Sequence, residues 1–154
     1  RRRHTRYISV TGVQTCALPI FNADIVWEDG PVPALRRLAA AYDPARMDAL
    51  LLLVARERAV GFEGPGDFYL EPDGRLVRRG ERPSAPFVYA GLQMLTPRLF
   101  ADAPEGPFSL NRLYDKALAA GRLFGLVHDG GWYHVGTPEA LADADRILAA
   151  AGAA

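Results

Sequence analysis

The chain has 154 residues, 49% of them hydrophobic, and its 18 lysines and arginines balance 18 aspartates and glutamates, so its formal net charge at pH 7 is zero. This length is enough for one domain with its own core, whereas no apolar run approaches the roughly 18 residues of a membrane-spanning helix, so we expect no membrane partner. The single cysteine, Cys16, excludes a disulfide framework.

The first twenty residues, RRRHTRYISVTGVQTCALPI, show neither helical nor alternating periodicity. They are too polar, and too broken by Gly12 and Pro19, for a signal peptide, while the arginines leave a nucleic-acid-binding or lipid-binding arm as an alternative. The segment resembles, nearly throughout, the translation of a common short-read sequencing adapter. We therefore expect residues 1–20 to be non-native and residues 21–154 to be an incomplete domain that begins at about Phe21.

The exclusion of this segment changes the charge of the remaining chain. Without the arginines at positions 1, 2, 3 and 6, 14 Lys+Arg face 18 Asp+Glu, an excess of about four negative charges. We therefore expect no nucleic-acid partner. The remaining chain has no cysteine, which is compatible with a cytoplasmic location.

The first predicted elements form a strand, a helix and a strand. Ile20-Phe21 and Ile25–Trp27 enclose Asn22-Ala23-Asp24, which predicts a strand that ends in polar groups. Residues Pro33–Tyr42 have helical spacing, and the predicted inner face is Leu35, Leu38, Ala39 and Tyr42. The apolar run in Asp48–Ala55 predicts a strand buried on both faces. This βαβ order predicts an α/β fold.

The middle of the chain predicts a small antiparallel insertion. Residues Phe68–Val77 contain two strand-like arms around Asp73-Gly74, a pair that favours a type I′ hairpin turn. After a polar loop at Arg79–Pro86, the segment Phe87–Leu95 predicts another strand with a glycine inside it.

The C-terminal third predicts a helix, two strands and a last helix. Ser109 can cap a helix that ends at Gly121, and its predicted inner face is Leu110, Leu113, Ala117 and Leu118. Residues Leu123–His128 predict a strand, and Trp132–Val135 a short partner strand across the intervening turn. Thr137-Pro138-Glu139 predicts the start of a helix that continues to Ala150.

Two segments carry residues suited to chemistry. Asp24 follows an apolar run, and a carboxylate at the carboxyl end of a strand can hold magnesium against phosphate oxygens, although an isolated acid there is also an ordinary turn or cap residue. In Trp132–Glu139, Gly136 permits close backbone approach and the helix start offers free N–H groups, although a well-capped terminal helix explains the same residues.

Four motifs in this order resemble those of the sugar nucleotidyltransferases, and most closely the N-acetylmuramate-1-phosphate uridylyltransferase branch. They are Asn22–Trp27, Gly66-Asp67-Phe68, Tyr89–Phe100 and Trp132–Glu139, and the resemblance spans essentially all of residues 21–150. It implies a Rossmann-like nucleotide-diphospho-sugar transferase fold, with a mixed, mostly parallel sheet and a small antiparallel insertion. It also implies truncation at the N-terminus, where the glycine-rich triphosphate-binding loop would lie.

The resemblance also implies site residues. The family's Asn-x-Asp carboxylate binds the catalytic Mg²⁺, which implies Asp24 as catalytic residue and metal ligand, with Asn22 near the nucleotide. Asp67 and Gly91 would lie at the sugar-phosphate pocket, although both could be turn and packing residues. His134 stands where the family has a second metal-binding aspartate. Because Mg²⁺ prefers oxygen ligands, three roles for His134 remain open: contact with phosphate or water, ligation of a metal such as manganese, or a structural role.

The implied reaction is attack by a sugar 1-phosphate on the α-phosphorus of a nucleoside triphosphate, UTP by the closest resemblance, with release of pyrophosphate. We expect the parent protein to catalyse it in the cytoplasm, in peptidoglycan recycling, and we expect this chain to be inactive and marginally stable. The alternatives are a non-catalytic nucleotide-sugar binding or regulatory module, and a metal phosphoesterase that uses Asp24 and His134.

Overall fold

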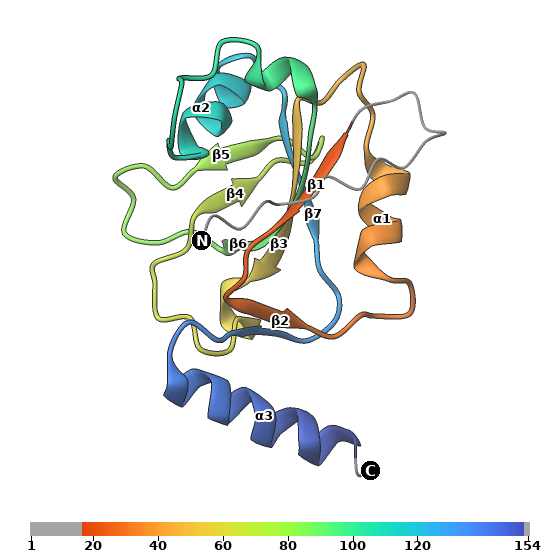
Figure 1. Cartoon of the computed structure of the whole chain (residues 1–154), viewed down its shortest axis with the longest axis vertical. Helices are drawn as coiled ribbons and strands as arrows, with labels where there is room; N and C mark the ends of the chain where they lie inside the picture. The colour runs from red at the N-terminus through yellow and green to blue at the C-terminus, as the bar shows by residue number, and fades with distance from the viewer. Residues whose placement is uncertain (1–16, 153–154) are drawn as a thin grey trace, which may run out of the picture.

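The computed structural model of the chain describes residues 17–152, in which a six-stranded mixed sheet lies between helices (Figure 1). Five strands follow the order β5-β4-β6-β3-β7, and β1 also pairs with β6. Their bounds are β1 Leu18–Phe21, β3 Ala49–Ala55, β4 Phe68–Leu70, β5 Leu76–Arg78, β6 Phe87–Leu95 and β7 Leu123–Val127.

A second sheet and the helices complete the described chain. The second sheet has two antiparallel strands, β2 (Ile25–Trp27) and β8 (Trp132–His134). The α-helices are α1 (Ala34–Ala41), α2 (Asn111–Ala119) and α3 (Pro138–Gly152), and the 3-10 helices are η1 (Arg56–Arg58) and η2 (Pro97–Phe100).

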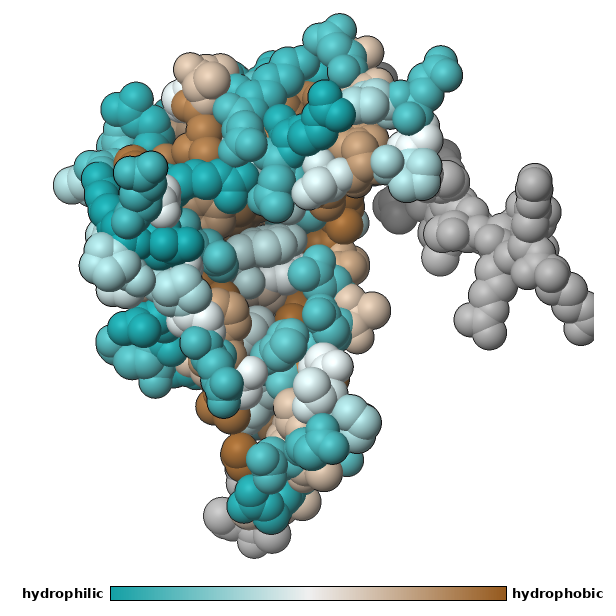
Figure 2. Space-filling model, turned by 90° about the vertical axis from the view of Figure 1, so that its left-hand side faces the viewer, coloured by the Kyte–Doolittle hydropathy of each residue, from teal (hydrophilic) through white to brown (hydrophobic). Residues whose placement is uncertain are grey.

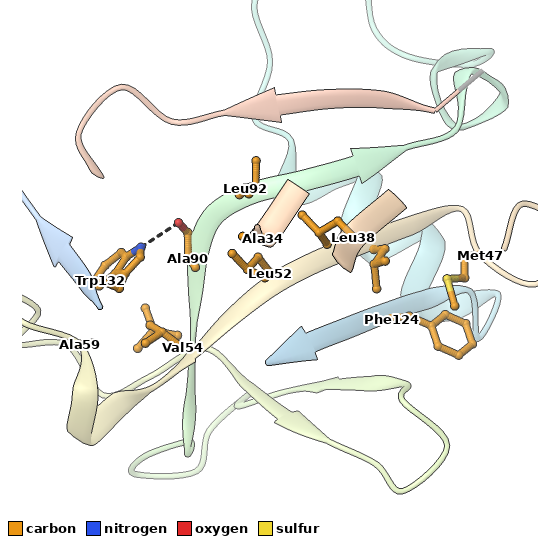
Figure 3. Packing of buried hydrophobic residues seen from close by; sticks show 12 residues of the cluster. Ala34, Leu38, Met47, Leu52, Val54, Ala59, Ala90, Leu92, Phe124 and Trp132 are labelled. Atoms are coloured by element: carbon orange, nitrogen blue, oxygen red, sulfur yellow. Dashed lines mark hydrogen bonds between the residues drawn. The ribbon is translucent and has the colours of Figure 1, made fainter. Parts of the chain in front are cut away.

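Strand β3 is the centre of the core, as its apolar run predicted. Alternate side chains of a strand point to opposite faces of the sheet. Leu50, Leu52 and Val54 pack in one cluster with Ala34 and Leu38 of α1 (Figure 3). On the other face the cluster consists of Ala49, Leu51 and Leu53 with Leu113 and Ala117 of α2, among others. The predicted burial of this strand on both faces is therefore confirmed.

The predicted α/β class with a mixed sheet is confirmed, but "mostly parallel" needs correction. Strands β1, β3, β4 and β7 run in one direction, while β5 and β6 run in the other. Because β6 lies between β1 and β3, and also next to β4, the named strands within residues 17–152 pair antiparallel except for β3 with β7. The β1-α1-β3 crossover therefore joins two strands of the same direction that are not neighbours.

The segment from Ile20 to Trp27 forms two strands where one was predicted. β1 pairs with β6, and the chain then leaves this sheet after Asn22, whose N–H donates to the Gly91 carbonyl at 2.8 Å. Strand β2 pairs with β8, so the prediction that residues 132–135 pair with β7 was wrong. The loop after β7 instead approaches the end of β2, where the Glu28 N–H donates to the Gly131 carbonyl at 3.0 Å.

Helix α1 is rotated from its predicted orientation. Ala34 and Leu38 are its buried residues, whereas Leu35 is 42% exposed. The Asp29 side chain accepts a hydrogen bond from the Ala34 N–H at 2.8 Å, which fixes the helix start with this alanine facing the sheet. The small side chain at position 34 allows the helix to pack closely on the sheet.

The predicted hairpin is present as β4 and β5, but its turn is not type I′. Gly74 has a φ of +89°, and no described residue other than glycine has a positive φ. The Gly74 N–H donates to the Glu71 carbonyl at 2.9 Å across Pro72 and Asp73. Proline fixes a negative φ at the second turn position, so the connection is a type I turn followed by a glycine in the left-handed region.

Helix α3 extends from the lower end of the molecule, and hydrophilic side chains cover most of the face seen in Figure 2. Thr137 Oγ1 accepts a hydrogen bond from the Ala140 N–H at 3.2 Å, which confirms the predicted helix start. Ala144 is buried while Leu141 is 46% exposed, so the helix is only partly covered. Within residues 17–152, no helix has the length and apolar character needed to cross a bilayer.

Candidate functional site

The two-stranded sheet brings together the acid and the histidine that the sequence singled out. Ile25 of β2 pairs with His134 of β8, and the Val135 N–H donates to the Asp24 carbonyl at 2.9 Å. These backbone bonds place Asp24, just before β2, beside the end of β8. Residues 110 positions apart in the sequence thus meet at one end of this small sheet.

The side chains of this pair face each other at the surface. Asp24 Oδ2 lies 3.5 Å from His134 Nε2, and the two side chains are 53% and 35% exposed. This separation is longer than an ordinary hydrogen bond of about 2.7–3.2 Å. The pair is therefore accessible to a ligand from solvent and is not closed by a strong hydrogen bond.

The His134 ring is held by its surroundings. The His134 N–H donates to the Val60 carbonyl at 2.9 Å, and the ring stacks with Trp132 at 6.4 Å between centroids. A Cβ at Gly136 would lie 2.7 Å from His134 Cε1, closer than real Cβ contacts, so only glycine leaves room for the ring in this position. Space for the His134 ring is thus a second reason for a glycine at position 136, besides the close backbone approach expected from the sequence.

Gly91 packs against the residues on either side of Asp24. It lies in a bulge of β6 with a φ of +78°, where the register against β3 shifts between Leu51 and Leu53. A Cβ at Gly91 would lie 2.7 Å from Ile25 Cδ1 and 3.1 Å from Asn22 Cβ. The glycine is thus buried under the chain that leads to Asp24. The side chain of Asn22, by contrast, is exposed.

Asp67 lies outside the Asp24–His134 pair. Its Oδ2 accepts a hydrogen bond from the Tyr89 N–H at 2.9 Å, and its own N–H donates to the Phe87 carbonyl at 2.7 Å. These bonds join the start of β4 to β6, two residues before Gly91. The turn and packing role that the sequence left open for Asp67 therefore has a direct structural basis.

Sequence reasoning missed the loop of residues 60–63, which lies against His134. A pocket of about 470 Å³ is lined by residues 60–63, by Tyr133 and His134, and by α3. Val60 forms an isolated parallel bridge with Tyr133, and Gly61, with a φ of +76°, lies against the His134 carbonyl. The only signal in the sequence was Val60-Gly61, an apolar residue followed by glycine.

His128 is a second residue that the sequence did not single out. Its side chain is 1% exposed, and Nε2 lies 3.1 Å from both the Glu28 and Gly131 carbonyls. Because both partners are acceptors, Nε2 carries a proton and donates to them. Tyr133 donates to the Glu28 carboxylate at 2.8 Å, and this hydrogen bond raises the pKa of the tyrosine. These contacts fix the end of the small sheet opposite Asp24.

The Asp24 carboxylate and the His134 imidazole can be compared with the ligands that a metal ion prefers. Residues 17–152 contain no cluster of three or more histidine, cysteine, aspartate or glutamate side chains suited to one ion. Mg²⁺ is commonly bound by one or two carboxylates with water and substrate phosphate, which fits Asp24. The imidazole of His134 does not suit Mg²⁺, because that ion prefers hard oxygen ligands.

Comparison with known proteins agrees with the resemblance seen in the sequence. The chain is 39% identical over 135 residues to an N-acetylmuramate alpha-1-phosphate uridylyltransferase of Caulobacter vibrioides, an alignment that covers 86% of this chain and 56% of the relative. The chain thus spans about half the length of that relative. No protein-family model matches the chain.

Solved structures of low identity share the fold. A Bacillus anthracis protein assigned as a glucose-1-phosphate thymidylyltransferase superposes with a TM-score of 0.61 at 16% identity, over 88% of this chain and 55% of that one. An apo UDP-glucose pyrophosphorylase superposes with a TM-score of 0.62 at 15% identity, over the same shares of the two chains. The predicted α/β fold with a mixed sheet, as found in solved nucleotidyltransferase structures, is therefore confirmed.

Proposed function

We propose that this chain is part of a sugar nucleotidyltransferase, and that its parent protein transfers a uridylyl group from UTP to a sugar 1-phosphate, N-acetylmuramate 1-phosphate, with release of pyrophosphate. The observation that carries this proposal is the 39% identity to an N-acetylmuramate alpha-1-phosphate uridylyltransferase. The exposed Asp24–His134 pair supports it, because the resemblance implies Asp24 as a metal ligand and aligns His134 with the family's second metal-binding aspartate. The setting would be peptidoglycan recycling in the cytoplasm.

The proposed roles follow from the exposed and buried groups. Asp24 presents an exposed carboxylate that would hold a divalent cation against phosphate, and Asn22 presents an amide that would contact the nucleotide. When bound, such a cation neutralises charge that develops on the phosphates. Gly91 would contribute by leaving space for Asn22 and Ile25. Asp67 would fix the position of β6, next to the sugar pocket, through its hydrogen bond from the Tyr89 N–H.

The test is pyrophosphate release by the parent protein, expressed from the recovered upstream reading frame. We expect UTP with N-acetylmuramate 1-phosphate to exceed CTP, dTTP or glucose 1-phosphate in kcat/KM by about tenfold or more, which is about 1.4 kcal/mol of transition-state binding. Equal rates with all nucleotide and sugar pairs would support nucleotidyl transfer in general and would contradict UTP and N-acetylmuramate 1-phosphate as the specific substrates. This chain alone is expected to release no pyrophosphate.

A non-catalytic nucleotide-sugar binding module is the second candidate, and the observation in its favour is His134 at the position of the family aspartate. The variant His134→Asp of the parent separates the two proposals. A parent without activity that gains it in the variant would indicate a module that has lost its metal chemistry. An active parent excludes this candidate.

We also propose that residues 1–20 are a sequencing artefact. Residues 1–16 lie outside the described part of the chain, while Leu18–Ile20 occupy β1, at the place where a native strand would pair with β6. The test is to sequence the source DNA across the codon of Phe21. We expect an open frame upstream that encodes different residues, and genomic DNA that encodes RRRHTR there would contradict the proposal.

A further inference from the structure

We infer that Asp24 and His134 form half of a metal site that selects a transition-metal dication such as Mn²⁺ over Mg²⁺. This inference rests on the proposed function, because the reaction gives the cation its phosphate partners. The family has two metal-binding aspartates, whereas this chain has one carboxylate, Asp24, and one imidazole, His134. The exchange of a carboxylate for an imidazole changes which ion the pair can bind.

The distance between the two donors suits chelation. Two ligand atoms each about 2.1 Å from a metal lie about 3.4 Å apart at a tetrahedral angle and about 3.0 Å apart at a right angle. Asp24 Oδ2 and His134 Nε2 lie 3.5 Å apart, so a shift of a few tenths of an ångström would allow both to bind one ion.

The imidazole is positioned before any ion arrives. Pairing with Ile25, the bond to the Val60 carbonyl and the stack on Trp132 fix its backbone and ring plane. Gly136 leaves space for the ring, since a Cβ there would lie 2.9 Å from His134 Nε2 itself. A donor that is already oriented loses little conformational entropy on binding, which favours its use as a ligand.

The chemistry of the donors sets the preference among ions. Mg²⁺ binds oxygen and gives up its water reluctantly, whereas imidazole binds readily to first-row transition ions, and Mn²⁺ accepts both nitrogen and oxygen. Two protein ligands leave several coordination positions for water and phosphate oxygens. No third acid or histidine joins the pair within the described residues, so binding of the ion alone will be weak and phosphate will strengthen it.

The experiment uses the ¹⁵N-labelled chain of residues 1–154 and Mn²⁺, whose paramagnetism broadens NMR signals of nearby amides. We expect the amides of Asp24, Ile25, His134 and Val135 to broaden first, while Thr96 and Gly121, near the opposite end of the sheet, keep their line widths. About a tenfold excess of Mg²⁺ should not restore the broadened signals. Inorganic pyrophosphate should lower the Mn²⁺ concentration required.

Variants give the decisive contrast. His134→Gln should abolish the local broadening, and His134→Asp should let Mg²⁺ displace Mn²⁺ at about tenfold lower concentration than in the original chain. Asp143→Asn is the matched control, since this acid lines the adjacent pocket and pairs with Arg146, and its broadening pattern should be unchanged. Equal broadening in His134→Gln, displacement by equimolar Mg²⁺ in the original chain, or no local broadening at all would overturn the inference.

A second measurement separates this inference from the proposed function. In the parent protein, the ratio of kcat/KM with Mn²⁺ to that with Mg²⁺ should fall about tenfold or more in His134→Asp. A parent that transfers uridylyl groups with an unchanged ratio keeps the proposed function and overturns the metal preference. A parent without transferase activity, whose chain still binds Mn²⁺ as described, overturns the function and keeps the preference.

Discussion

Different interactions determine the structure around β3 and the structure of the small sheet of β2 and β8. Leu51 and Leu53 are fully buried between helices, and their positions follow from apolar side chains that must leave water. Asp24 and His134 are 53% and 35% exposed, and backbone pairing and glycine contacts determine where they lie. The first region therefore supplies stability, while the second carries the exposed residues that we propose for chemistry.

The largest expected effect lies in the core. Leu51→Ala should lower the free energy of unfolding by about 2–5 kcal/mol, because it removes buried methyl groups and leaves a cavity next to α2. Denaturant unfolding of the parent protein measures it. Leu35→Ala is the matched control, since Leu35 is 42% exposed, and it should cost less than about 0.5 kcal/mol. Equal costs would mean that β3 is not the centre of the core.

Gly91 connects the two regions, so its replacement should affect both. Gly91→Ala combines a positive φ with a Cβ 2.7 Å from Ile25, and we expect a loss of roughly 2–4 kcal/mol. Gly80→Ala separates the two causes, because Gly80 has a φ of +60° but no atom within 4 Å of a Cβ. Its cost should be only about 1 kcal/mol. Similar costs for both variants would exclude the contact with Ile25.

Asp48 gives a smaller effect that depends on pH. Burial opposes its ionisation, but hydrogen bonds from Arg122 and Arg98 prevail and hold its pKa below the ordinary value. A lowered folded-state pKa stabilises the protein above the unfolded pKa of about 3.9, and this contribution is lost as pH falls further.

Asp48→Asn should therefore cost roughly 1–2 kcal/mol at pH 7 and should reduce the loss of stability below about pH 4. Melting temperatures of both proteins between pH 3 and pH 7 measure this difference. Parallel pH profiles would show that the arginines do not stabilise the ionised carboxylate.

The sequence predicted the core better than the site for a physical reason. Strands β3 and β6 appeared within a residue of their predicted bounds, because long apolar runs have few alternatives to burial. The predicted orientation of α1 was wrong, because the hydrogen bond from the Ala34 N–H to Asp29 determines which face is buried. The predicted partner of β8 was also wrong, because the loop at Gly131 brings β8 to β2. The motif resemblance singled out Asp24 and His134, whereas no pattern predicted that Val60 and Gly61 would lie against His134.

A small effect on stability is expected at Gly136. Gly136→Ala should change the free energy of unfolding by less than about 1 kcal/mol, because the neighbour that a Cβ meets is the ring of a partly exposed side chain. The same variant should move the His134 imidazole and weaken the Mn²⁺-induced broadening. NMR shifts of the His134 ring report the movement, and an unmoved ring would contradict the close contact.

The central claim is that chemistry resides at Asp24 in the parent protein. Its most direct test is the rate of pyrophosphate release from UTP and N-acetylmuramate 1-phosphate by the parent and by its Asp24→Asn variant. Asp102→Asn is the control, since this exposed acid pairs with Lys116 of α2. We predict a loss of at least about 100-fold for Asp24→Asn, with an unchanged melting temperature, and less than about threefold for Asp102→Asn. A folded Asp24→Asn variant that keeps its rate within about threefold would contradict the claim.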